Sequence, residues 1–282
     1  MQRFPGDLFS ISDKAFDTAI PVIENLRRIR AAGFTHLHLA WKWTKAEPFL
    51  PAEIAEWTAA LKESGIRVLD AHGCHPPGID LWSEAAETRE AALALLQDRV
   101  RLARHFGGDA VVYHVPWRGP VLDQELAWFL EGIEYVIPLC REFGVAIAIE
   151  NHYLAENDRR ALTAAFDAFD AEWVGFTFDP GHALISGNME WLLAQGASRL
   201  KVLHLNDNDA LKDCHWCPYD AEGQADWDQI CRFLYRSGYR KPLQLEVSWT
   251  PARHGSHETF LKTAFEAVYA LQQRIESGTD KV

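Results

Sequence analysis

The sequence predicts a single-domain α/β protein, a (β/α)8 or TIM barrel spanning residues 1–282, and three observations lead to this fold class. Short apolar, β-branched runs alternate with segments that carry apolar residues at helical spacing. This strand–helix unit recurs about every 35 residues, which is typical of parallel strands joined by crossover helices. No linker rich in Ser, Pro or Gly divides the 282 residues, and barrels of this class commonly form one domain of about 250 residues.

The predicted elements follow one another in regular order. Strands are expected at 35–41, 66–73, 110–115, 145–151, 174–179, 201–206 and 242–248, and a weaker pattern near 8–11 supplies the eighth. Helices are expected at 16–32, 52–64, 84–106, 124–143, 159–169, 189–195, 227–237 and 257–275. Glycines suited to cap a last helical turn are Gly33, Gly65, Gly144 and Gly238. The alternative, an open doubly wound sheet, usually has a glycine-rich turn after its first strand, and this sequence has none.

The composition excludes several classes of protein. With 48% hydrophobic and 24% charged residues, the chain is not disordered. Its 28 basic and 40 acidic residues give a net charge of −12, which argues against a general nucleic-acid binder. No stretch is apolar enough to predict a membrane span. The 5 cysteines, including the lone CxxC pair Cys214 and Cys217, do not form a disulfide framework. We therefore expect a reduced, cytoplasmic protein.

Polar residues at the ends of the predicted strands indicate an active site, because a barrel places its site at the carboxyl ends of its strands. Glu150, Asp179, His204 and Glu246 each follow an almost unbroken apolar run. Three ionised carboxylates cannot lie close together in a partly buried site, because their repulsion and lost hydration would force them to take up protons. A bound divalent cation removes this repulsion. This oxygen-rich set favours Mn²⁺, with Zn²⁺, Mg²⁺ or Co²⁺ as alternatives.

Further polar residues at the same rim have more than one interpretation. His182 is a substrate contact, a ligand or a packed histidine, and we favour substrate contact. His72 and His114 either reach the substrate or lie in the barrel core. Asp213 and His215 form an Asp-x-His pair that, together with His182, could hold a second metal, or they belong to a solvated loop.

Tryptophans also gather after the predicted strands: Trp41, Trp43, Trp117, Trp216 and Trp249. Indole faces stack on sugars and exclude water, and we expect Trp41 and Trp117 to contact the substrate. Packing is the alternative for each of them. Stacking on nucleobases is a competing use, against which the net charge of −12 counts.

Several motifs resemble those of the xylose-isomerase-like TIM-barrel superfamily of sugar (phosphate) isomerases and epimerases. They are IAIENH at 147–152, FDPGHA at 178–183, VLHLND at 202–207, EGQADW at 222–227 and PLQLEV at 242–247. The resemblance implies one divalent metal held by Glu150, Asp179, His204 and Glu246, with His182 close to the substrate. In the ketose 3-epimerase branch the two metal-bound glutamates exchange the proton, and a glutamate at the spacing of Glu156 binds the sugar. Where that branch has an arginine, this chain has Ala210.

The same superfamily contains the endonuclease IV-like AP endonucleases, whose three-zinc site resembles a set of residues found here in order. The set is His72, His114, Glu150, Asp179, His182, His204, Asp213, His215 and Glu246. A DNA-kinking enzyme also needs basic loops across its rim, and this rim offers only Lys42, Lys45, Arg118 and Arg253. Metal-dependent dehydratases of the superfamily and a non-catalytic binding barrel are the remaining alternatives.

Taken together, these features predict a metal-dependent isomerase or epimerase of a sugar, a sugar phosphate or a polyol-derived ketone. The expected mechanism polarises a carbonyl with the metal and moves a carbon-bound proton with Glu150 and Glu246 through a metal-bound enediolate. The expected partner is a small carbohydrate, with nucleic acid disfavoured. A homo-oligomer is also expected, with the helical segment at 125–137 as a contact.

Overall fold

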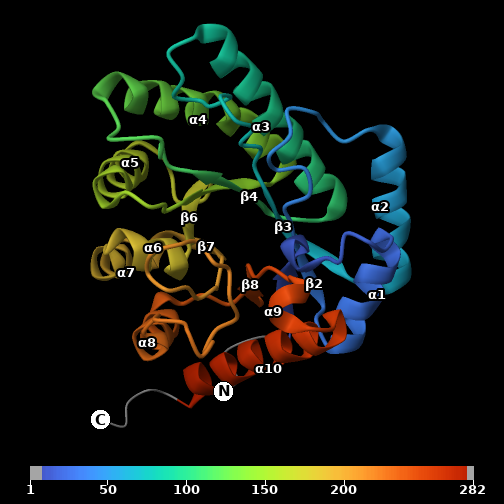
Figure 1. Ribbon diagram of the computed structural model, residues 1–282. Helices are drawn as coiled ribbons and strands as arrows, with labels where there is room; N and C mark the ends of the chain where they lie inside the picture. The colour runs from blue at the N-terminus through green and yellow to red at the C-terminus, as the bar shows by residue number, and fades with distance from the viewer. Residues whose placement is uncertain (1–7, 278–282) are drawn as a thin grey trace.

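The computed structural model describes residues 8–277, and over these residues eight parallel strands form one barrel (Figure 1). The strands are β1 (Phe9–Ser12), β2 (His36–Leu39), β3 (Arg67–His72), β4 (Ala110–His114), β5 (Ala146–Glu150), β6 (Val174–Phe178), β7 (Leu200–Leu203) and β8 (Leu243–Leu245). Strands β1 to β7 each pair with their neighbours in sequence, and β1 also pairs with β8. Leu205 bridges to Leu245 just beyond β7 and nearly closes the ring. The predicted single-domain barrel is confirmed, and the open doubly wound sheet is wrong.

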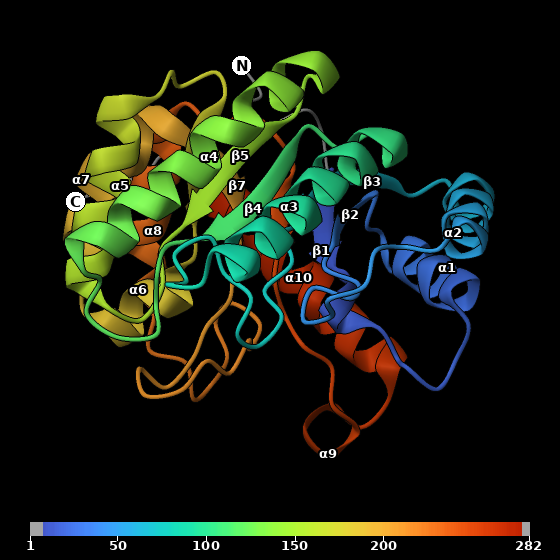
Figure 2. The same cartoon turned by 90° about the horizontal axis from the view of Figure 1, so that it is seen from above.

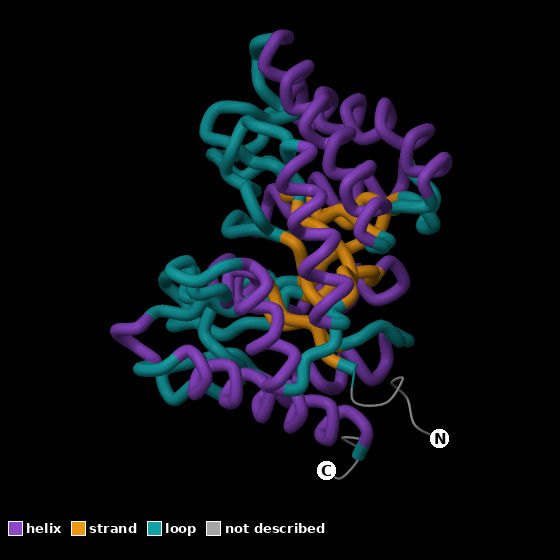
Figure 3. The backbone as a smooth tube through the Cα atoms, turned by 90° about the vertical axis from the view of Figure 1, so that its right-hand side faces the viewer, coloured by secondary structure: helices purple, strands orange, loops and turns teal. Residues whose placement is uncertain are grey.

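The helices surround the strands, as Figures 1 and 3 show. They are α1 (Val22–Ala32), α2 (Pro51–Ser64), α3 (Ala86–Phe106), α4 (Asp123–Phe143), α5 (Ala155–Ala168), α6 (Pro180–Ser186), α7 (Met189–Gly196), α8 (Trp227–Ser237), α9 (Pro251–His254) and α10 (His257–Glu276). Short 3-10 turns are η1 (Asp13–Ala15) and η2 (Ala197–Arg199). None of the helices within 8–277 is long and apolar enough to cross a membrane.

Two predicted helix starts need correction, and two short helices were not predicted. The first helix begins at Val22 rather than residue 16, because Pro21 starts it and the Asn25 side chain holds the preceding loop by donating to the carbonyl of Asp17. Helix α5 begins at Ala155, four residues before the predicted start. The short helices α6 and α9 were not expected, since neither is long enough to show helical periodicity.

Side-chain alternation along the strands separates two apolar layers. Residues such as Val111 and Ile147 face outward and belong to the large core shared with the helices. The residues that alternate with them point the other way. Ala110, Val112, Ala148 and Val202 form a small separate cluster inside the barrel. Successive strand residues point to opposite faces, so the next inward positions fall just beyond this cluster. Those positions are His114, Glu150 and His204.

The loops at the carboxyl ends of the strands carry the rest of the site. Figure 2 shows the loops after β3 and β7 and the short helix α9 along the same lower edge of the molecule. Arg99 of α3 is fully buried and holds the loop after β2 in place. Arg99 donates from Nη2 to the Trp41 carbonyl at 2.8 Å and from Nε to Cys74 Sγ at 2.9 Å. Its guanidinium lies 5.1 Å from the centre of the Phe49 ring.

We expect Arg99→Met to lower the free energy of unfolding by about 3 kcal/mol, because it removes charged hydrogen bonds to buried acceptors. Urea denaturation followed by circular dichroism measures the change. Arg101→Met, at an exposed position of the same helix, should change stability by no more than about 0.5 kcal/mol. Equal effects of the two variants would contradict the supporting role of Arg99.

Candidate metal centre and active site

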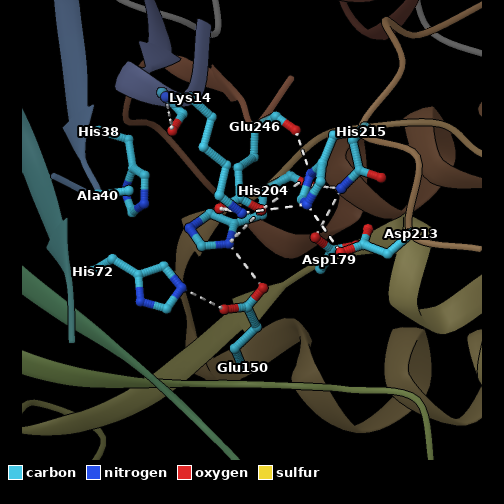
Figure 4. Close-up of polar contacts among 12 residues, drawn as sticks. Lys14, His38, Ala40, His72, Glu150, Asp179, His204, Asp213, His215 and Glu246 are labelled. Atoms are coloured by element: carbon cyan, nitrogen blue, oxygen red, sulfur yellow. Dashed lines mark hydrogen bonds and ion pairs between the residues drawn. The ribbon is translucent and has the colours of Figure 1, made fainter. Parts of the chain in front are cut away.

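Four side chains from four neighbouring strand ends converge inside the mouth of the barrel. Glu150 ends β5, Asp179 follows β6, His204 follows β7 and Glu246 follows β8, and all four are buried. Each offers a ligand atom, and these atoms all lie within 4.8 Å of one another. His204 Nδ1 lies 2.8 Å from Glu150 Oε1 and 3.4 Å from Glu246 Oε2, so this imidazole lies between the two glutamates (Figure 4). The structure thus brings together the four residues predicted as metal ligands.

The electrostatics of this four-residue group favour the binding of a cation. Burial, together with the charge of Glu246, raises the pKa of Glu150 to about 8. Burial likewise raises the pKa of Asp179 to about 6. Burial would also raise the pKa of Glu246, but the charges of His204 and Lys14 outweigh it and hold that pKa well below its ordinary value. Carboxylates that repel one another in a buried site are typical of a metal centre.

Amide side chains orient Asp179 within the group. Asn206 Nδ2 donates to Asp179 Oδ2 at 2.8 Å, and the His182 amide donates to Asp179 Oδ1 at 2.8 Å. Asn151 Oδ1 accepts from the Asp179 amide at 3.0 Å. Such outer hydrogen bonds fix the direction in which a ligating carboxylate points.

A second group of possible ligands adjoins the first through Glu150. His72, His114 and Glu150 also offer ligand atoms within 4.8 Å of one another. His114 Nε2 lies 3.0 Å and His72 Nε2 3.6 Å from Glu150 Oε2. Burial lowers the pKa of both histidines well below the ordinary value, which leaves them neutral. His75 packs against this second group, since its ring stacks on that of His114 with ring centres 4.5 Å apart.

Three further residues named from the sequence meet on the other side of the four-residue group. His182 Nε2 lies 3.6 Å and His215 Nε2 2.9 Å from the same oxygen, Asp213 Oδ2. His182 Nδ1 donates to the Asn151 carbonyl at 2.9 Å, and its Nε2 faces Asp213. Burial would lower the pKa of His182, but the charges of Asp179 and Asp213 outweigh it and hold that pKa well above its ordinary value. Tyr153 donates its hydroxyl to the same Asp213 oxygen at 3.0 Å. The loop at 213–215 therefore contacts the site, unlike a purely solvated loop.

The remaining predicted substrate contacts lie at different distances from this site. Trp117 stacks on His152 with ring centres 5.0 Å apart, and His152 in turn lies 4.8 Å from His182. Trp41 packs instead against Trp57 at 5.9 Å. Glu156 lies in the first turn of α5 and is exposed, so the structure does not bring it into the four-residue group.

Sequence reasoning missed Lys14 and also His38, the partner of Asp70. Lys14 Nζ lies 2.9 Å from Glu246 Oε1. His38 Nδ1 donates to Asp70 Oδ1, and Gln244 Nε2 donates to that oxygen at 3.2 Å. A partial signal was available, because Ser10 and Ser12 alternate with apolar residues along β1, and Lys14 follows directly in the 3-10 turn η1. The weak apolar pattern of that strand concealed it.

Comparison with known proteins identifies the family. A family model described as xylose isomerase-like TIM barrel matches residues 26–267. The chain belongs to the xylose isomerase-like TIM-barrel family. The resemblance inferred from the motifs is therefore confirmed.

Individual relatives of this xylose isomerase-like chain are distant. The uncharacterized protein y4fM of Sinorhizobium fredii is 27% identical over 290 residues, covering 91% of this chain and 90% of y4fM. The solved structure of a D-tagatose 3-epimerase-like protein is 16% identical, with a TM-score of 0.74 over 94% of this chain and 98% of that one. An L-ribulose 3-epimerase is 14% identical, with a TM-score of 0.76 over 95% of each chain. At such identities the solved structures show a shared fold.

Proposed function

We propose that this chain is a divalent-metal-dependent isomerase or epimerase of a sugar or a polyol-derived ketone. The observation that carries the proposal is the convergence of Glu150, Asp179, His204 and Glu246 at the mouth of the barrel. The names of the two solved structures with the same fold, both of which refer to a 3-epimerase, support the substrate class. The position of the reacting carbon stays open, because Ala210 stands where the ketose 3-epimerase branch has an arginine.

The residues present suit a hard or borderline cation. Three carboxylates and one imidazole form a donor set that favours Mn²⁺, with Zn²⁺, Mg²⁺ or Co²⁺ as alternatives. The Nδ1 atom of His204 faces both Glu150 and Glu246 within 3.4 Å, so one ion could replace these contacts with coordination bonds. When bound, such an ion polarises a substrate carbonyl and stabilises the negative charge that develops on its oxygen.

The glutamates are proposed to move the proton. A carboxylate oxygen of Glu150 or Glu246 removes a proton from the carbon next to the carbonyl, and the other glutamate returns one. Because the two side chains approach His204 from different directions (Figure 4), they can address different faces of a substrate. Return to the opposite face of the same carbon gives epimerisation, and return to the neighbouring carbon gives isomerisation.

Other residues around the four-residue group are proposed to bind the sugar. His72, His114 and His182 lie within 4 Å of a carboxylate of the group and can hold substrate hydroxyls. Trp117 and His152 form a stacked aromatic wall beside them. For Trp41 and Glu156, sugar binding stays a prediction that neither position supports directly.

A second candidate is a multinuclear centre of the kind found in endonuclease IV-like enzymes. The gathering of His72 and His114 on Glu150, and of His182 and His215 on Asp213, favours it. The rim argues against DNA as the substrate, because three of its four expected cations are already paired with carboxylates. The pairs are Lys42 with Glu53, Arg118 with Asp80, and Arg253 with Asp220 and Glu222.

A substrate panel tests the proposal. Aldoses, ketoses, inososes and their phosphates would be incubated with metal-loaded protein in D₂O, with an abasic-site DNA duplex in parallel. We expect exchange of a carbon-bound proton in at least one hydroxy-carbonyl compound and an intact duplex. Duplex cleavage without turnover of any sugar would reverse the ranking of the two candidates.

The stabilisation of the fold by a bound metal ion should increase with pH. The metal must displace the protons that burial retains on Glu150, with a pKa of about 8, and on Asp179, with a pKa of about 6. The rise in melting temperature on adding Mn²⁺ should thus be small at about pH 5.5 and largest above about pH 8. Glu150→Gln should flatten the upper part of this dependence. An equal rise at both pH values would contradict the assignment.

Two broader expectations also stay proposals. A cytoplasmic location is consistent with the free thiols of all five cysteines.

A homo-oligomer is proposed through α4, where Tyr135 is exposed at the surface of the helix and Leu122 at its N-terminal end. Trp128 on this helix is half-buried beneath the guanidinium of Arg89, so it is the less available contact.

A further inference from the structure

Lys14 places a positive charge inside the acidic mouth of the barrel. Its Nζ atom lies 2.9 Å from Glu246 Oε1 and 3.3 Å from His215 Nε2, and it sits 5.1 Å from the centre of the Trp43 ring. Only 17% of the Lys14 side chain is exposed. An ammonium on a long side chain is seldom buried to this extent without a specific acceptor.

The turn that carries Lys14 is held in place from both sides. The neighbouring Asp13 accepts hydrogen bonds from the Ala40 amide at 3.1 Å, at the end of β2. The carbonyl of Ala15 accepts from His257 Nε2 of α10 at 2.8 Å. The position of the ammonium is therefore fixed by the barrel, and Figure 4 shows Lys14 reaching toward Glu246 and His215.

His215 has one ring nitrogen that could bind a cation, and Lys14 lies against it. The Nδ1 atom of His215 donates to the backbone carbonyl of Glu246 at 2.9 Å, because a carbonyl can only accept. The other ring nitrogen, Nε2, donates to Asp213 Oδ2 at 2.9 Å, since a carboxylate only accepts, and it lies 3.3 Å from Lys14 Nζ. A metal ion that replaced this proton on Nε2, at about 2.1 Å, would lie within roughly 5.5 Å of the ammonium and be repelled by it.

We propose that Lys14 serves as a built-in cation that keeps a metal ion away from His182, Asp213 and His215. The inference rests on the proposed function, since it concerns how many cations the metal centre holds. The ammonium supplies one positive charge to Glu246 and to the carboxylate of Asp213 nearby, which removes part of the demand for another ion. The chain then retains the metal at the four-residue group and lacks the additional ion that a multinuclear centre would hold at Asp213.

Zinc binding by variants of the full chain tests this role, with Zn²⁺ alone as the probe because it favours imidazole ligands. The bound zinc per chain would be measured by elemental analysis after dialysis, for the wild type, Lys14→Met, Lys14→Gln and Lys14→Met combined with His215→Ala. Lys42→Met removes a lysine that pairs with Glu53 outside the centre and serves as the matched control. Thermal melting confirms that each variant is folded.

We expect both single Lys14 variants to bind one more equivalent of zinc than the wild type. The added His215→Ala change should remove that equivalent, and Lys42→Met should bind as the wild type does. The inference is overturned if the Lys14 variants bind no additional zinc, or if the additional zinc survives the loss of His215. The zinc content of the wild type tests the proposed function separately. A wild type that binds no metal contradicts the four-ligand centre, whatever amount of zinc the variants bind.

Discussion

Replacing Glu246 by Gln should lower turnover by roughly 10²-fold or more, the scale of general acid–base catalysis. The amide keeps the shape of the side chain and one oxygen that can bind a metal, but it cannot accept the proton. Glu246 is nearly fully buried and lies among His204, Lys14 and His215. We expect metal to be retained at reduced affinity.

Turnover numbers for Glu246→Gln would be measured with metal at saturating concentration, so that weaker metal binding does not enter the comparison. Glu131→Gln, at an exposed position of α4, is the matched control and should leave turnover unchanged. Near-native turnover of both Glu246→Gln and Glu150→Gln would show that the two carboxylates do not move the proton.

Removing the metal should have an effect of similar size. A chelator should lower turnover to below about 1% of the loaded value, because the carbonyl then lacks its Lewis acid. An ion present at about 1,000 times its Kd stabilises the fold by about 4 kcal/mol. In a chain of this size its removal should lower the melting temperature by about 10 °C. Calorimetry and turnover before and after readdition of Mn²⁺ measure both effects.

His204→Ala provides the corresponding variant, since it removes the one imidazole of the four-residue group. It should abolish the stabilisation by Mn²⁺, whereas His105→Ala, at an exposed position of α3, should keep it. If His204→Ala is stabilised by Mn²⁺ as strongly as the wild type, the ion binds elsewhere and the assignment of the ligands is wrong.

Much of the fold could be predicted because the parallel strands are buried on both faces. Runs such as those at 145–151 and 174–179 are almost wholly apolar, and both strands lie where they were expected. Short elements lacked this signal. Helix α6 spans only Pro180–Ser186, too few residues for a periodic pattern. Asp179 followed by Pro180 was its one local indication, as a cap and a first helical residue.

The four-residue group was predictable for the same reason. A carboxylate directly after an apolar strand, as at Glu150, is conspicuous, and the barrel brings such strand ends to one mouth. Lys14 could not be found in this way, because β1 is short and contains Ser10 and Ser12. Its contact with Glu246 joins residues far apart in the chain, and it depends on the closure of the barrel between β1 and β8. Glu156 is a case in which the sequence pattern does not settle the position of the side chain. It lies six residues after Glu150, but this spacing does not determine which face of the helix it occupies, and its side chain is exposed.

The central claim is that buried carboxylates of a metal centre move a carbon-bound proton, and the deuterium content of the product tests it most directly. Metal-loaded protein would convert its sugar substrate in D₂O, and nuclear magnetic resonance would measure deuterium at the reacting carbon. We predict that solvent deuterium enters the product, and that Glu150→Gln and Glu246→Gln lower its rate of entry by roughly 10²-fold. Full conversion without deuterium would indicate direct transfer of hydrogen between carbons and would contradict the two-carboxylate mechanism.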